Sequence, residues 1–114
     1  MVAVEITEED VIETLDIFTK VPSFLLKRWV NNNKNLVEMF QGQIEDQKDK
    51  ISHIDRLRLN KVLEMPVDEL QEILNRAYQQ TNKKQLKILA DPGAKSFITL
   101  NMDELKRIFT DNSK

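Results

Sequence analysis

The chain of 114 residues contains no cysteine. It therefore has no disulfide framework, no thiolate nucleophile and no thiolate metal site, and we expect a reducing, cytoplasmic location. No apolar run approaches the roughly 18 residues that a membrane-spanning helix needs, and the first ten residues carry acids where an export signal carries bases. We expect neither an export signal nor a membrane partner.

Glycine and proline are also scarce, with two and three copies. Strand-rich and loop-rich folds need such residues at many tight turns, so their scarcity favours helices. A hydrophobic fraction of 40% with 32% charged residues is typical of a chain that folds around a core. The sequence predicts a mainly α fold, a compact bundle of about five helices in one domain over residues 1–114, with a frayed tail at 110–114.

The first two helices are indicated by their start signals. Thr7 and Asp10 have the spacing of a capping box, which predicts a helix over about residues 8–19. Pro22 then disfavours helical backbone at the preceding residue, and the serine after it is a good N-cap. A short second helix is predicted over residues 24–31.

From Leu36 onward the apolar residues follow a heptad pattern. This repeat predicts one long central helix, which continues or resumes as far as Leu63. Its apolar stripe either packs inside the domain or, if it remains exposed, pairs with a second copy of the chain. The a and d positions are Val37, Phe40, Ile44, Gln47, Ile51 and Ile54, of which only Gln47 is polar.

Two more helices are predicted on either side of the least helical stretch, residues 81–100. One starts at Pro66 and runs to about residue 80, and the other is capped by Asn101. Between them, the turn residues Asp91-Pro92-Gly93-Ala94 separate two short apolar runs. Two interpretations stay open: a small β-hairpin near 85–100, or a helix over 83–90 followed by an extended linker.

The net charge of −2 hides a segmental bias. Residues 1–19 hold six acids and no base, whereas residues 20–36 hold four bases and no acid. Residues 81–100 hold four lysines and a single acid, Asp91. A local basic surface can therefore exist on a nearly neutral protein, and the overall charge does not exclude a nucleic-acid partner.

The sequence gives little support for a catalytic, metal-binding or nucleotide-binding site. The one imidazole, His53, falls on an outer position of the heptad, where a solvated histidine is expected. Glu45, Asp49 and His53 are spaced four residues apart and could share one helical face, but the sequence nominates no further ligand for a metal ion. Two glycines cannot build a phosphate-cradling loop. We expect no catalytic residue, no metal and no cofactor.

The first basic segment resembles the general helix-turn-helix motif of DNA-binding proteins. The resemblance implies that Phe24, Lys27, Arg28 and Asn31 are offered to DNA, with Asn31 able to read adenine and Arg28 guanine. Lysines of a hairpin at 85–100 could add a basic wing. One observation opposes the DNA-binding interpretation: the preceding helix is acidic and would repel nearby phosphates. An ordinary helical hairpin with a cationic rim explains the same residues.

The leading hypothesis is a small non-catalytic regulatory or adaptor protein that binds another protein or a second copy of itself. Aromatic side chains beside arginine dominate the energetics of protein interfaces. The alternative is a helix-turn-helix transcriptional regulator that binds DNA through the helix at 24–31. The candidate partner-binding residues are Phe24 and Trp29, together with Val37, Phe40 and Ile44 if the heptad stripe is exposed.

Overall fold

The structure, a computed structural model, describes residues 5–110. This range consists of nine α-helices and one short 3₁₀ helix and contains no strand, so the mainly α prediction is confirmed. The predicted number of about five helices is too low. The helices predicted over residues 8–19 and 36–63 are divided by breaks, and residues 84–90 form a further helix. The helices are α1 (Glu8–Thr14), α2 (Asp16–Thr19), α3 (Ser23–Asn31), α4 (Leu36–Met39), α5 (Gln41–Lys48), α6 (His53–Leu63), α7 (Val67–Thr81), α8 (Lys84–Ala90), the 3₁₀ helix η1 (Pro92–Ala94) and α9 (Lys95–Thr110).

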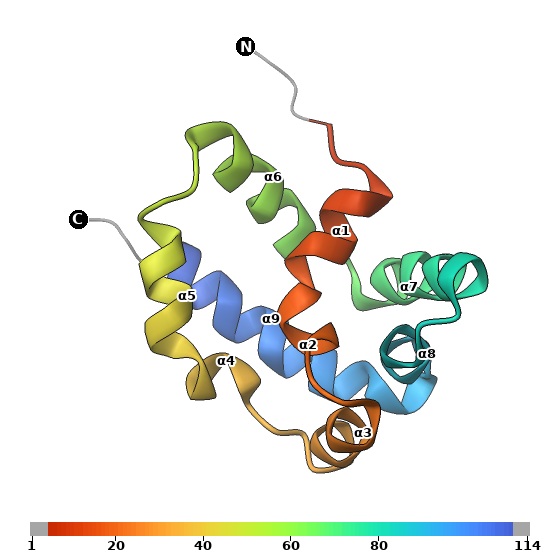
Figure 1. Cartoon of the computed structure of the whole chain (residues 1–114). Helices are drawn as coiled ribbons and strands as arrows, with labels where there is room; N and C mark the ends of the chain where they lie inside the picture. The colour runs from red at the N-terminus through yellow and green to blue at the C-terminus, as the bar shows by residue number, and fades with distance from the viewer. Residues whose placement is uncertain (1–4, 111–114) are drawn as a thin grey trace.

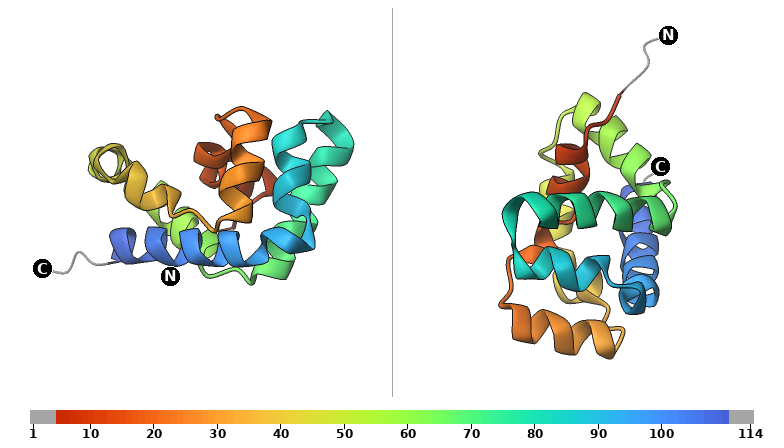
Figure 2. Two further views of the ribbon diagram at one scale, coloured as in Figure 1. Left: turned by 90° about the horizontal axis from the view of Figure 1, so that it is seen from below. Right: turned by 90° about the vertical axis from the view of Figure 1, so that its right-hand side faces the viewer.

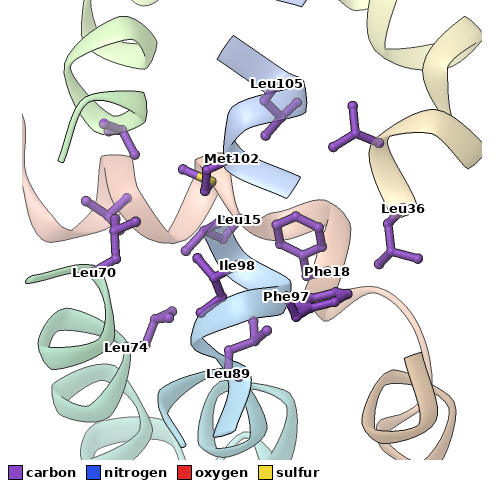
Figure 3. Close-up of a cluster of buried hydrophobic side chains, with 14 of the residues drawn as sticks. Leu15, Phe18, Leu36, Leu70, Leu74, Leu89, Phe97, Ile98, Met102 and Leu105 are labelled. Carbon is purple, nitrogen blue, oxygen red and sulfur yellow. The ribbon is translucent and has the colours of Figure 1, made fainter. Parts of the chain in front are cut away.

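Helix α9 crosses the molecule in Figure 1, and both views of Figure 2 show that it lies along one side of the molecule. Helices α4, α6 and α7 contact it directly. The buried apolar side chains form one cluster, in which Phe18 of α2 meets Phe97 of α9 edge-on, with ring centroids 5.6 Å apart (Figure 3). Each fully buried Leu or Phe contributes about 1.5–3 kcal/mol relative to exposure, so this cluster is the main source of stability. Of the predicted frayed tail, residues 111–114 lie outside the described residues.

The predicted capping box of the first helix is confirmed. The Thr7 amide donates to the Asp10 carboxylate at 2.8 Å, and the Asp10 amide donates to the Thr7 hydroxyl at 3.2 Å. The helix is shorter than predicted, because the backbone leaves the helical range at Leu15 (φ −91°, ψ 10°). The Thr14 hydroxyl donates to the Asp10 carbonyl at 2.9 Å, a bond of the kind that bends helices. The chain then continues as α2.

The predicted long central helix is wrong. The backbone breaks at Phe40 (φ −110°, ψ 23°), and residues 49–52 lie outside any helix, so the segment forms α4, α5 and α6. The Ser52 hydroxyl accepts a hydrogen bond from the Asp55 amide at 3.1 Å and caps a new helix there. A coiled-coil dimer would need a continuous helix, which this segment does not provide.

The sequence predicts that Asn101 caps the last helix. This prediction is wrong, because that helix, α9, already begins at Lys95. The Asn101 side chain is fully buried and instead binds the first amides of α4, 65 residues away, beside that helix's own N-cap, Asn35. The side-chain oxygen accepts from the amides of Leu36 at 2.8 Å and Val37 at 3.2 Å. The side-chain nitrogen donates to the carbonyls of Lys34 at 3.0 Å and Phe97 at 2.9 Å. The Asn101 amide fixes the start of α4 against α9.

Of the two interpretations of residues 81–100, the helix is confirmed and the β-hairpin is wrong. Residues 84–90 form α8, but no extended linker follows, because η1 leads directly into α9. The Asp91 carboxylate accepts from the Gly93 amide at 2.9 Å and so starts the 3₁₀ turn. Phe97 and Ile98 are fully buried on the first turns of α9. The two apolar runs therefore belong to two helices joined by a short turn.

Candidate functional site

Helix α3 presents a polar outer face. Its inner face is formed by Leu26 and Val30, which are buried in the core, while Trp29 packs partly buried against the same core. The outer face carries the four residues that the sequence nominated for DNA. Phe24, Lys27, Arg28 and Asn31 are all exposed, and Phe24 leaves 76% of its surface in solvent, the most of any large apolar residue in the described chain.

Helix α8 lies beside this face. The chain reverses after α7 at Asn82, whose left-handed backbone (φ 57°) ends that helix. Helix α8 then packs between α7 and α3, and the right-hand view of Figure 2 shows the three helices side by side in the order α7, α8, α3. The Gln85 side chain donates to the Val21 carbonyl at 2.8 Å, which links α8 to the segment that starts α3. A second amide, buried Gln71 of α7, donates to the carbonyls of Leu89 and Asp91 and holds the end of α8.

An open groove of about 540 Å³ runs between α3 and α8. Phe24, Lys27 and Asn31 form one wall, spaced three and four residues apart along α3, and Arg28 lies outside the lining. The opposite wall comes from α8 and from Tyr78 at the end of α7. The full lining is Ser23, Phe24, Lys27, Val30, Asn31, Tyr78, Lys84, Lys87, Ile88, Asp91 and Gly93.

The groove is lined by three lysines and one acid. Residues 20–36 and 81–100, which supply its α3 and α8 walls, hold eight bases and one acid, a net charge of +7. The rest of the chain holds nine bases and eighteen acids, a net charge of −9. The one acid in the lining, Asp91, already accepts a hydrogen bond from the Gly93 amide. The two walls of the groove thus come from two basic segments of a chain that is acidic elsewhere.

The cations at this face are available to a ligand. Within residues 5–110, no carboxylate forms an ion pair with Lys27, Arg28, Lys83, Lys84 or Lys87, and all five are exposed. Lys20 and Lys95 differ, since Asp16 and Asp68 pair with them at 3.2 and 2.7 Å. The Lys87 ammonium lies 5.8 Å from the centre of the Tyr78 ring, an attractive cation–π arrangement.

A second hollow, an apolar cleft of about 330 Å³, lies near α2, α5, α6 and α9. Phe40 and Ile44, two of the nominated partner-binding residues, line this cleft together with Ile17, Ile51, Leu59 and Phe109. Val37 is fully buried and cannot touch a partner in this fold, and Ile44 is only 8% exposed. The heptad stripe therefore packs mostly inside the protein.

The residues weighed for catalysis or metal binding do not come together. His53 is exposed at the start of α6, and the break at residues 49–52 separates it from Glu45 on α5. Glu45, Asp49 and His53 therefore do not share the one helical face that their spacing in the sequence suggests. In the described range, no group of three or more His, Asp or Glu side chains is arranged to hold a metal ion.

No protein-family model, no curated protein and no solved structure matches this chain. From residue 5 to residue 110, no helix is both long and apolar enough to cross a membrane.

Proposed function

We propose that this protein is a non-enzymatic nucleic-acid-binding protein whose site is the groove between α3 and α8. One observation carries the proposal: two basic segments about fifty residues apart in the sequence line one open groove, although the protein as a whole is acidic. This juxtaposition is the reason to rank nucleic acid above a protein partner.

The electrostatics favour a polyanion. Each phosphate that a cation neutralises releases counterions, which drives binding and makes it salt-dependent. If the three lining lysines, Lys27, Lys84 and Lys87, each meet one phosphate, the slope of log affinity against log salt is about −2 for a single strand. Affinity then falls about 20-fold between 50 and 200 mM salt.

The acids of α1, a reason against a DNA partner at the level of sequence, do not line the groove, and Asp16 of α2, which packs against α3 and α8, is paired with Lys20. The Glu8 carboxylate pairs with Arg76 of α7 at 2.7 Å, and α1 packs on α6 and α7. Figure 1 shows the start of α1 far from α3. The repulsion that these carboxylates exert on phosphates in the groove is therefore screened by distance and solvent.

Fluorescence anisotropy with labelled oligonucleotides at 50 mM salt tests the proposal. The variant Lys27→Ala/Lys84→Ala/Lys87→Ala removes three cations of the lining and should reduce the salt slope by about 2. The control Lys48→Ala/Lys50→Ala/Lys61→Ala removes the same charge from α5, α6 and the turn between them and should bind like the parent. Absence of binding to every oligonucleotide, or equal losses in both variants, would contradict the proposal.

Binding of a protein partner is a second candidate function, supported by the apolar cleft lined by Phe40 and Ile51. An amphipathic helix is the occupant that such a cleft suits. A partner captured by the parent and by the triple-lysine groove variant, but lost with Phe40→Ala/Ile51→Ala, would favour this function. Light scattering on the pure protein separates self-association, and a monomer at high concentration removes that version.

A further inference from the structure

We infer that the groove between α3 and α8 takes an unpaired, single-stranded segment of nucleic acid, with a base stacked on Phe24. The inference rests on the proposed function and specifies its ligand. It departs from the helix-turn-helix hypothesis, in which α3 reads a duplex.

The shape of the site favours a single strand. A duplex is read by a protruding helix or ribbon that enters a major groove about 12 Å wide. Here Phe24, Lys27 and Asn31 line a hollow whose other wall is α8, so the surface is concave where a duplex needs a ridge. The β-hairpin wing that would have flanked a duplex is absent, because residues 84–90 are helical. A flexible strand can lie along such a hollow.

The aromatic side chains of the groove offer rings on which a base can stack. Phe24 lines the groove and is 76% exposed, so its ring is accessible to a stacking base. Tyr78 lines the same groove, with the Lys87 ammonium 5.8 Å from its ring centre. Single-strand-binding proteins combine stacking rings with cations that follow the backbone. An acidic peptide would use the lysines but gain no stacking from the rings.

The length of the groove sets the size of the ligand. Its lining extends from Ser23 to Asn31, the whole of α3, and nine helical residues span about 13 Å. At the 3.4 Å spacing of stacked nucleotides, this length accommodates about four nucleotides. Lys84 and Lys87 lie one helical turn apart on the opposite wall, where they can meet successive phosphates. The Asn31 amide can donate to or accept from a base edge.

Competition between defined ligands tests the inference. The protein is titrated with a fluorescein-labelled ten-nucleotide dT strand, its rU counterpart, a blunt DNA hairpin with the same number of phosphates, an abasic strand and polyglutamate. We expect both single strands to bind at least about tenfold more tightly than the hairpin, the abasic strand or polyglutamate. A preference between dT and rU identifies which source of single strands fits better.

Variants at position 24 separate stacking from general contact. Phe24→Leu keeps an apolar side chain but lacks a ring, and should weaken dT binding at least fivefold with an unchanged salt slope. Phe24→Trp should retain the parent affinity. Met39→Leu and Ile54→Ala change the other two exposed large apolar residues and should have no effect. Because Phe24 is exposed, circular dichroism should show all four variants folded.

The outcomes are distinguishable. Hairpin binding equal to single-strand binding, with Phe24→Leu unchanged, overturns the single-strand inference and leaves the proposed function standing. Equal affinity for the abasic strand overturns it as well, because no base is then needed. If no nucleic acid binds at 50 mM salt, or polyglutamate binds best, both the inference and the proposed function fail.

Discussion

Replacing Asn101 with alanine tests how strongly the buried amide holds α4 on α9. The Val37 amide loses its acceptor and becomes a buried donor without a partner, which costs about 1–3 kcal/mol. The Leu36 amide keeps its bond to the Lys34 carbonyl at 3.1 Å but loses the shorter one, at a cost of about 0.5–1 kcal/mol. Alanine regains about 0.5 kcal/mol of helix propensity. The free energy of unfolding should therefore fall by about 1–3.5 kcal/mol, with a middle value of about 2 kcal/mol.

Urea unfolding measures this loss directly, with the fluorescence of the single tryptophan, Trp29, and circular dichroism as independent probes. A loss of this size lowers Tm by about 10 °C for a chain of this length. Thr99→Ala, an exposed change on the same helix, is the control and should stay within about 0.5 kcal/mol of the parent. If Asn101→Ala costs no more than Thr99→Ala, the role given to the buried amide is wrong.

Three further changes probe other parts of the fold. Gly42→Ala should raise the free energy of unfolding by about 0.5–1 kcal/mol, because a Cβ there meets nothing within 4 Å and α5 gains helix propensity; destabilisation in urea would contradict this. Gln71→Ala removes two bonds to carbonyls at the end of α8 and should accelerate hydrogen exchange of the α8 amides about tenfold or more, whereas unchanged exchange would refute that role. Lys95→Ala breaks an exposed ion pair with Asp68 and should cost less than about 1 kcal/mol in urea unfolding while leaving oligonucleotide affinity within about twofold; a larger change in either would show that Lys95 has a further role.

Local signals predicted the helix starts well. The Thr7–Asp10 capping box appears as the sequence indicates, and helices begin directly after Pro22 and Pro66. The expected N-cap at Ser23 is wrong, because Ser23 is already the first residue of α3 and Pro22 stands at the N-cap. The breaks at Phe40 and at residues 49–52 were missed, because the apolar period continues across them. The Ser-x-x-Asp spacing of Ser52 and Asp55 was a local sign of the second break.

Long-range features could not be read from the chain. Asn101 looked like the cap of the last helix, but its side chain accepts from the first amides of α4, 65 residues away, and no local pattern reveals that contact. The four exposed residues of α3 were nominated from the sequence, and so were both basic segments. Their meeting across a groove depends on how α8 packs between α7 and α3, which the sequence does not reveal.

Chemical-shift mapping by NMR tests the central claim most directly. The ¹⁵N-labelled full chain is titrated with the unlabelled dT strand at 50 mM salt, and the backbone amides report where the ligand lies. The account predicts shifts concentrated in α3, in α8 and around Tyr78, with the apolar cleft near Phe40 unaffected. Shifts centred on the cleft, or no shifts at saturating strand concentration, would contradict it.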